Sequence, residues 1–401
     1  MPATPTVRIA IALSLGAALS LGVARFAYGL LLPPMRADLG WSYVLAGAMN
    51  TSNAAGYLLG ALAAPWLMRR WSPGAVLMAG SLLASGLLAV GALFTGTTAW
   101  LVQRLLVGVG SALVFSTGGL LAARLGATDP GRAGLLIGLY YGGTGLGITL
   151  SALTVPWVLE AASAQAHPWA WGWAALAVLC GVATVLLRWP VRQMARIGAA
   201  PAPAAGSVPA APAPRLRLRP FAFGLAGYAM FGVGYIGYMT FVIALLREQG
   251  QSPARITVFY ALLGVAVMVS PRLWAWLLDR YRDGRPLALL NALLGVATLL
   301  PAVAGAWPLV MLSGLLFGAV FLSLVASTTA LVRHNLPPAQ WAAGIAAFTI
   351  VFAAGQIIGP TMVGWVSDGP GGLQRGFVLS AVALWIGAAL ALRQRALPRT
   401  D

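Results

Sequence analysis

Charged residues are scarce in this 401-residue chain, and acidic residues are the scarcest among them. Only 8% of the residues are charged, whereas soluble domains carry about 25%. Hydrophobic residues make up 60% of the chain. Folded in water, this composition would expose large apolar patches. It therefore excludes an ordinary soluble protein and predicts that lipid is the solvent for most of the surface.

Residues that perform acid–base or metal chemistry are also nearly missing. The chain has one cysteine, Cys180, and two histidines, His167 and His334, which we expect to lie in loops. We expect all eight acidic residues to lie in loops, tails or helix ends. A single cysteine allows no intrachain disulfide, and no His/Asp/Glu grouping supplies a reactive centre at membrane depth. We therefore predict no enzymatic activity, no cofactor and no metal ion.

The basic residues are all arginine, because lysine is absent, and they favour one side of the predicted membrane. With a cytoplasmic N-terminus, most arginines fall in cytoplasmic loops and tails, and the opposite loops hold only Arg36, Arg247, Arg255 and Arg375. The positive-inside rule then places both termini in the cytoplasm. Short arginine clusters do not form the continuous basic face of a nucleic-acid-binding protein. We therefore predict no nucleic-acid partner and expect contact with anionic lipid headgroups.

Twelve apolar runs have the length of a membrane-crossing helix, which needs about 20 residues. They lie at 8–33, 43–67, 74–95, 98–124, 133–159, 169–189, 220–246, 254–278, 286–305, 308–332, 341–366 and 375–393. The first run begins like a secretory signal, but it continues past Arg25 to Pro33, which is longer than a signal core. The sequence therefore predicts an all-α integral membrane protein with twelve transmembrane helices, the first of them uncleaved.

A Pro/Ala/Gly-rich stretch at 198–214 separates the first six runs from the last six. Such a composition has nothing to bury and favours a semi-extended linker. We predict an N-terminal six-helix bundle at 1–189, a basic cytoplasmic linker at 190–219 and a C-terminal six-helix bundle at 220–401. Two similar halves predict a transporter with its site between them, near the bilayer midplane.

Three motifs give the chain a family resemblance. "RLLVGVG" (104–110) resembles the helix-4 motif of the major facilitator superfamily (MFS), and "DRYRDGR" (279–285) resembles its cytoplasmic Asp-Arg-x-Gly-Arg loop. "GQIIGP" (355–360) resembles its helix-11 Gly-Pro segment. The opening "RFAY…PPM" (25–35) resembles the YbfB/YjiJ-like bacterial branch. The resemblance implies the two-bundle MFS fold and a transporter of unassigned substrate in the bacterial inner membrane, which we expect to be a monomer.

The same resemblance implies a set of residues that control conformational change. In the loop and in helix 11 they are Asp279, Arg280, Arg285, Gly355 and Pro360. The loop after the second span keeps a basic pair, Arg69 and Arg70, but lacks the acidic residue of the family pattern. Gating in this half is therefore expected to depend on apolar packing.

Three arginines, Arg25, Arg104 and Arg272, fall inside predicted spans. Each costs about 2.5–3.5 kcal/mol at a helix centre, and no acidic residue is predicted at that depth to neutralise them. We therefore hypothesise that Arg25 and Arg272 face a central cavity and bind an anionic substrate, most simply a carboxylate. Arg272 also lies in "SPRLWAWLLDR", which resembles helix 8 of oxalate and monocarboxylate carriers, where an arginine engages the substrate carboxylate.

Each arginine also has a structural interpretation. Arg104 could clamp backbone carbonyls of neighbouring helices, because its motif recurs regardless of substrate. Arg272 could extend to the cytoplasmic headgroups. Arg25 has no short route to an interface, so the substrate-binding interpretation is strongest for it.

Aromatic and amide side chains could complete the pocket, or they could only line packed helix interfaces. Tyr28 and Tyr141 are the better candidates, because Tyr28 follows Arg25 by three residues on the same helix face and Tyr141 enters a glycine-lined helix. The other candidates are Gln356, Asn50, Asn53, Tyr140, Tyr235 and Tyr238.

The sequence therefore predicts a secondary transporter for a small organic anion, working by alternating access. The missing embedded carboxylate or histidine argues against a side-chain proton relay. Anion exchange, uniport and symport with a protonated substrate all remain open. The alternative within transporters is a carrier of a neutral or zwitterionic solute, such as an amino acid, sugar-like or drug-like compound. A receptor that binds without translocating would differ in showing no flux.

Overall fold

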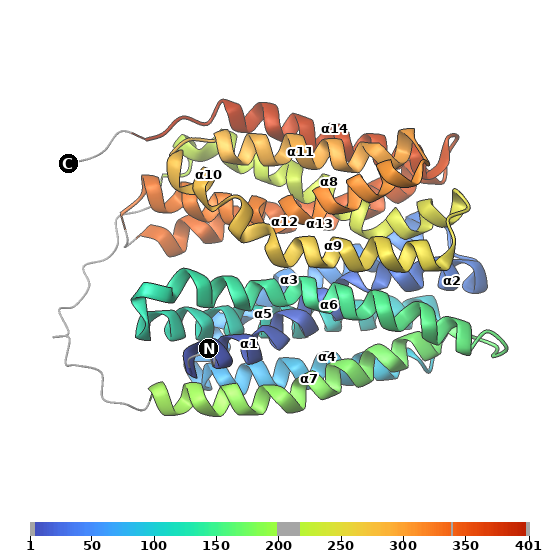
Figure 1. The fold of residues 1–401 in the computed structure, drawn as a ribbon, viewed down its shortest axis with the longest axis horizontal. Helices are drawn as coiled ribbons and strands as arrows, with labels where there is room; N and C mark the ends of the chain where they lie inside the picture. Colours follow the sequence, from blue (N-terminus) through green and yellow to red (C-terminus); the bar gives the residue numbers. More distant parts are fainter. Residues whose placement is uncertain (1–4, 199–216, 338–339, 398–401) are drawn as a thin grey trace.

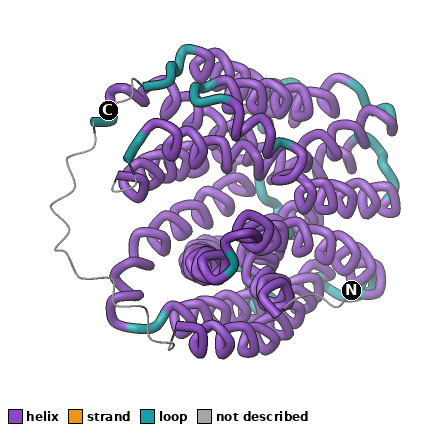
Figure 2. The backbone as a smooth tube through the Cα atoms, turned by 60° about the vertical axis from the view of Figure 1, so that its left-hand side comes forward, coloured by secondary structure: helices purple, strands orange, loops and turns teal. Residues whose placement is uncertain are grey.

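The structure is a computed structural model that describes residues 5–198, 217–337 and 340–397. These residues form helices joined by short loops, and no strand occurs among them (Figure 2). The all-α prediction is confirmed. The N-terminal half comprises α1 (Pro5–Ala17), η1 (Ala18–Phe26), α2 (Tyr28–Leu39), α3 (Tyr43–Arg70), α4 (Pro73–Gly91), α5 (Thr97–Thr128), η2 (Pro130–Arg132), α6 (Ala133–Ala161) and α7 (Pro168–Gly198).

The C-terminal half follows residues 199–216, which lie outside the described part of the chain and hold most of the predicted linker. It comprises η3 (Arg219–Phe221), α8 (Ala222–Glu248), α9 (Pro253–Leu273), α10 (Ala275–Arg280), α11 (Arg285–Val303), α12 (Trp307–Asn335), α13 (Trp341–Ser367) and α14 (Gly372–Leu392). Because α7 continues to Gly198, residues 190–198 are helical rather than part of an extended segment. His334 lies in the last turn of α12 and not in a loop.

Eleven helical segments of the described chain are long and apolar enough to cross a membrane. The first of them joins α1, η1 and α2 over Pro5–Leu39, and another joins α9 and α10. The predicted span at 43–67 corresponds to α3, which has 28 residues but is not apolar enough to belong to this set. The reason is local, since Asn50, Thr51, Ser52 and Asn53 follow one another in its N-terminal half.

Serine residues mark where three of the helices begin. Ser42, Ser72 and Ser252 each have extended backbone and accept a hydrogen bond from the N–H three residues later, at the start of α3, α4 and α9. This is the preferred way to satisfy one of the free N–H groups of a first helical turn. At the other end of the first span, Gly40 has a φ of 64°, a left-handed conformation that terminates α2 and that glycine adopts readily.

The helices form two groups that lie side by side in Figure 1, with the blue-to-green N-terminal half below the yellow-to-red C-terminal half. The halves meet where α6 lies against α9, α3 against α13 and α2 against α8. We call the end of the molecule at which α3, α5, α10 and α12 finish, on the left of Figure 1, the arginine-rich end. The last two turns of these helices hold Arg69, Arg70, Arg124, Arg280 and Arg333. The other end is called the opposite end.

Glycine allows the close approach of α6 and α9. A Cβ atom added to Gly145 would overlap the backbone oxygen of Gly264, and a Cβ at Gly264 would overlap the Thr149 hydroxyl. The Thr149 hydroxyl donates to the Ala261 carbonyl across the same interface, at 3.1 Å. Small residues allow backbone packing of this kind in lipid, where packing replaces the hydrophobic effect as the main attraction between helices.

We expect Gly145→Leu to force α6 away from α9 and to destabilise the protein by about 1–3 kcal/mol, the usual cost of overpacking. The measurement is the thermal unfolding midpoint of the purified protein in detergent. Gly181→Leu is the matched control, because a Cβ at Gly181 of α7 would meet open space. Equal midpoints for the two variants would contradict the role given to Gly145.

Candidate functional site

Arg25 lies at the boundary between the two halves. Its side chain is 3% exposed and extends from η1, the π-helical segment of the first span. One terminal nitrogen, Nη2, donates a hydrogen bond to the amide oxygen of Gln356 from α13. The Nε atom is buried and has no hydrogen-bond partner among the described residues. The structure therefore brings together two residues that the sequence selected independently, one from each half.

Aromatic rings surround this guanidinium. Its carbon lies 5.4 Å from the ring centroid of Tyr57 and 6.0 Å from that of Phe26, distances typical of cation–π contacts. Tyr57 in turn lies near Tyr141 of the same half and Tyr235 of the other half. Arg25 thus sits among phenol groups from both halves. Tyr57 did not stand out in the sequence, where a tyrosine inside the predicted span 43–67 is unremarkable.

Arg104 has both terminal nitrogens engaged by other residues of the protein, whereas its Nε, like that of Arg25, is buried without a hydrogen-bond partner among the described residues. It is fully buried in α5, and its Nη1 donates to the Ala24 carbonyl at 3.0 Å. Its Nη2 donates to the Asn50 amide oxygen at 3.1 Å. The ring of Tyr28 lies 4.9 Å from its guanidinium carbon. This arrangement is the clamp that the structural interpretation of Arg104 expected, and it fixes the backbone directly before Arg25.

Tyr28 belongs to the same clamp. It is fully buried, and its hydroxyl donates to the Ala46 carbonyl of α3 at 2.9 Å. Asn50 continues the network into the C-terminal half, since its amide nitrogen donates to the Thr240 hydroxyl of α8 at 2.7 Å. Among the other candidates, Asn53, Tyr140 and Tyr238 form hydrogen bonds within their own halves.

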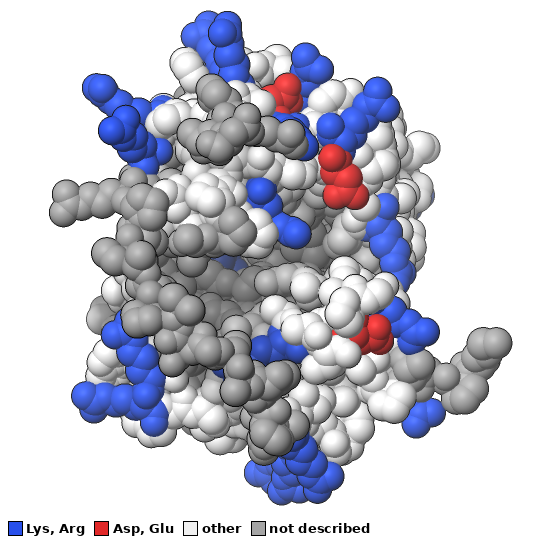
Figure 3. Space-filling model, turned by 90° about the vertical axis from the view of Figure 1, so that its left-hand side faces the viewer, with Lys and Arg blue, Asp and Glu red and all other residues white. Residues whose placement is uncertain are grey.

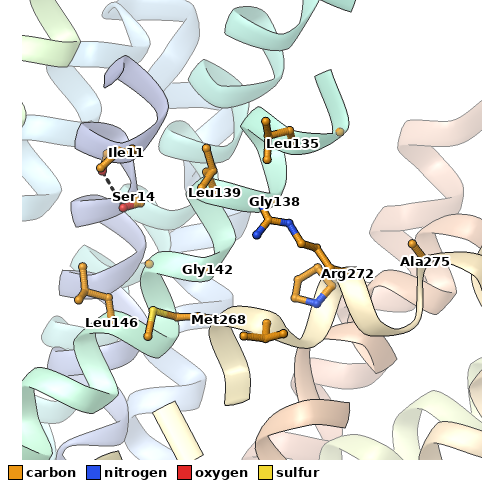
Figure 4. A pocket seen from close by; sticks show the side chains of 14 residues that line it. Ile11, Ser14, Leu135, Gly138, Leu139, Gly142, Leu146, Met268, Arg272 and Ala275 are labelled. Carbon is orange, nitrogen blue, oxygen red and sulfur yellow. Dashed lines mark hydrogen bonds between the residues drawn. The ribbon is translucent and has the colours of Figure 1, made fainter. Parts of the chain in front are cut away.

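Arg272 lies near the arginine-rich end, in the last turn of α9, and is exposed. It lines a cleft of about 570 Å³ between α1 and α6 of one half and α9 and α10 of the other. Its side chain points toward Gly138 of α6 across this cleft (Figure 4). Seen from the arginine-rich end, the molecule is hollowed between the halves (Figure 3). Within the described residues, no carboxylate lies within ion-pair distance of Arg25, Arg104 or Arg272.

The opposite end is closed by a carboxylate that the sequence did not single out. Asp368 follows α13, and its two oxygens accept hydrogen bonds from the backbone N–H groups of Tyr43 and Val44, at 2.7 and 2.8 Å. These N–H groups belong to the first turn of α3, where free donors and the helix dipole both attract a negative charge. A residue of one half therefore caps a helix of the other. We call this contact the Asp368 latch.

A second carboxylate of the C-terminal half reinforces the latch. The Tyr43 hydroxyl donates to Glu248 at the end of α8. The guanidinium carbon of Arg36 lies 3.8 Å from the Tyr43 ring centroid. Closer to the membrane centre, the Thr51 hydroxyl donates to the Ile357 carbonyl of α13 at 2.6 Å. The contacts between α3 and α13 thus run from the opposite end toward the middle of the molecule.

The residues that the family resemblance implies for gating lie in two places. At the arginine-rich end, Arg285 pairs with Asp283 at 3.3 Å within its own loop, while Asp279, Arg280, Arg69 and Arg70 are exposed. Gly355 and Pro360 lie in α13. A Cβ at Gly355 would overlap the Ala229 carbonyl of α8, and one at Gly47 of α3 would overlap the Pro360 carbonyl. Gly355 thus serves packing within its half, and Pro360 lies at the boundary between the halves.

The family model defines the chain as a transporter of the major facilitator superfamily. The chain belongs to the family described as uncharacterised MFS-type transporter YbfB, whose model matches residues 17–392. No curated protein is similar enough in sequence to match it.

Solved transporters share the architecture at low sequence identity. A bacterial homolog of the human lysosomal transporter Spinster, in an inward-facing and unoccupied conformation, aligns with a TM-score of 0.74 at 16% identity, covering 99% of this chain and 100% of that one. The nucleoside transporter NupG aligns at 0.72 and 14% identity, covering 98% and 99%. The transporter FucP, in an outward conformation, aligns at 0.62 and 16% identity, covering 97% and 99%.

We expect Arg104→Met to destabilise the protein by about 1–3 kcal/mol, because it removes both donors and leaves buried acceptors on Ala24 and Asn50 unpaired. Thermal unfolding in detergent measures the loss. Arg124→Met, an exposed arginine on the same helix, is the control and should leave the midpoint unchanged. A fully stable Arg104→Met protein would show that the clamp does not hold the fold.

We expect Asp368→Ala to weaken the closed arrangement of the opposite end by about 1 kcal/mol, the typical worth of a helix N-cap. Spin labels on Ala37→Cys and Gln374→Cys, two exposed positions at that end, report the separation of the halves by pulsed electron paramagnetic resonance. The background carries Cys180→Ala, which removes the native cysteine.

In this background, Asp368→Ala should add a population at longer distance, whereas Glu160→Ala, an exposed carboxylate of α6, should not. An unchanged distance distribution in Asp368→Ala would refute the latch.

Proposed function

We propose that this protein is a secondary active transporter that moves a small organic anion, most simply a carboxylate, across the bacterial inner membrane. The observation that carries the proposal is the environment of Arg25. This guanidinium is buried between the halves, only its Nη2 forms a hydrogen bond with a described residue, and the acceptor is the neutral amide of Gln356.

Electrostatics favours an anionic ligand at this position. A buried cation without a counter-charge is costly, and a neutral acceptor recovers only part of the lost hydration. A substrate carboxylate would supply both the charge and two acceptor oxygens, which match the fork of an arginine side chain. Arg104 has both terminal nitrogens occupied by acceptors of the protein. Arg25 is therefore the cation that a ligand can take.

Arg272 gives the substrate a second cationic contact on its route. It lines the cleft between α6 and α9 and faces an otherwise mostly apolar wall. An exposed arginine there attracts anions toward the space between the halves. We assign Arg272 to this entry route and Arg25 to the central binding position.

Arginine placement supports a cytoplasmic location of the arginine-rich end, by the positive-inside rule. In that orientation the Asp368 latch closes the periplasmic side, and the cleft at Arg272 opens to the cytoplasm. Rocking of the halves would break the latch and close the cleft, which gives alternating access to Arg25. Arg69, Arg70, Asp279, Arg280 and Arg285 would then lie where the halves approach each other and the lipid headgroups.

We expect Arg25→Ala to abolish stabilisation of the purified protein by carboxylates and their saturable uptake into proteoliposomes. The variant removes the cation that a carboxylate neutralises, so the effect should be at least tenfold in affinity. Arg272→Ala should slow uptake and retain binding.

Arg188→Ala, an exposed arginine of α7, is the control for both variants. Normal uptake by Arg25→Ala, or equal stabilisation by carboxylates and their uncharged amides, would favour the alternative of a neutral or zwitterionic solute.

A further inference from the structure

The tyrosines of the transmembrane region fall into two sets according to what their hydroxyls do. The hydroxyls of Tyr28, Tyr140, Tyr238 and Tyr260 form hydrogen bonds at 2.8–3.0 Å with backbone or serine oxygens, and the Tyr228 hydroxyl is hydrogen-bonded to the Thr328 side chain. Those of three others, Tyr57, Tyr141 and Tyr235, form no hydrogen bond with a described residue. The three unbonded tyrosines come from α3, α6 and α8, and Tyr57 lies near both of the others.

Two of these tyrosines lie beside Arg25, and the third lies beside Tyr57. The guanidinium carbon of Arg25 is 5.4 Å from the ring centroid of Tyr57, and Tyr235 approaches Arg25 from the C-terminal half. The group therefore combines one cation that lacks a counter-charge with three phenols that lack hydrogen-bond partners. Polar groups inside a folded protein are almost always paired. Their convergence at one point between the two halves indicates a place for a ligand.

Aromatic rings bound the same place in the N-terminal half. Phe115 of α5 lies 5.3 Å from Tyr141 and 6.5 Å from Tyr57, measured between ring centroids. All three residues are half-buried rather than buried, so part of each ring faces open space. They lie on the side of Arg25 that is nearer to the arginine-rich end.

The C-terminal half contributes a wall of nearly parallel rings. Phe352 is half-buried and stacks on Tyr228, Phe231 and Tyr235, with interplanar angles of 21°, 10° and 19°. It precedes Gln356 by one helical turn, so both residues lie on the same face of α13. Gln356, which accepts the hydrogen bond of Arg25, and Phe352 are therefore neighbours on α13.

We propose that the substrate of this site is an aromatic carboxylate, a deduction that rests on the proposed function and narrows it. The carboxylate takes the position of the Gln356 oxygen on Arg25. The flat ring lies between the Tyr57 and Phe115 side of the N-terminal half and the Phe352 side of the C-terminal half. The unbonded phenols then donate to oxygen atoms of the substrate. A ligand that stacks on both halves also favours their approach.

The test uses four ligands and the purified full-length protein. Benzoate, cyclohexanecarboxylate and hexanoate carry the same charge but differ in aromatic character, and benzamide keeps the ring and loses the charge. Binding is measured by isothermal titration calorimetry, with thermal stabilisation as a second readout. We expect benzoate to bind about three- to tenfold more tightly than the two aliphatic acids, the usual gain from stacked rings, and we expect benzamide to show no binding.

Substitutions of the proposed site residues test where the preference for benzoate arises. Phe352→Leu and Tyr57→Leu should reduce the preference for benzoate over cyclohexanecarboxylate to near one and retain carboxylate binding. Phe223→Leu, an exposed phenylalanine of α8, is the matched control and should keep the preference. Gln356→Glu should abolish benzoate binding, because a carboxylate built into the protein would occupy Arg25.

The outcomes separate this proposal from the general one. Equal affinity for the three acids without binding of benzamide would overturn the aromatic substrate and leave the organic-anion transporter intact. Binding of benzamide as tight as that of benzoate would overturn both, and so would the absence of binding by all four ligands at millimolar concentration. A preference for benzoate that survives in Phe352→Leu and Tyr57→Leu would overturn the assigned site.

Discussion

Positive charge without a counter-charge in the middle of the membrane is the constraint on which the rest of this structure depends. Two arginines, Arg25 and Arg104, are buried close to each other, and no carboxylate of the described residues pairs with either. Neutral oxygen atoms and aromatic rings offset the free-energy cost of burying these charges. Arg104 takes a backbone carbonyl and an amide, and through them it holds the segment that presents Arg25. The same residue type thus has two environments, since Arg104 bonds within its own half and Arg25 bonds to Gln356 of the other half.

Much of the architecture could be predicted from the sequence, because lipid imposes length and composition on every span. The two interpretations of Arg104 were also available beforehand, and the structure has the clamp. The pairing of Arg25 with Gln356 joins positions 331 residues apart, and the Asp368 latch joins positions 325 apart. Neither contact leaves a local pattern in one sequence. An aspartate after a helix suggests only a loop, until the helix that it caps is placed beside it.

The contacts between the halves are uneven, because the halves are hydrogen-bonded at the opposite end and separated by a cleft at the arginine-rich end. Hydrogen bonds of α3 with α13 extend from the Asp368 latch to Thr51, and the cleft at Arg272 opens at the other end. Carboxylates therefore act where helix ends meet water, and neutral groups act at depth. Such a division suits a protein that must repeatedly separate its halves, since a capped helix end loses little when water replaces the cap.

The polarity of α3 has a consequence for how the chain enters the bilayer. Its Asn-Thr-Ser-Asn run makes α3 less apolar than the other spans. Asn50 and Asn53 both form hydrogen bonds with Arg104 of α5, and α4 lies between α3 and α5 in the chain. During synthesis, α3 leaves the ribosome before that partner exists. The insertion machinery must therefore retain α3, or let it wait at the interface, until α5 arrives and the two enter the lipid together.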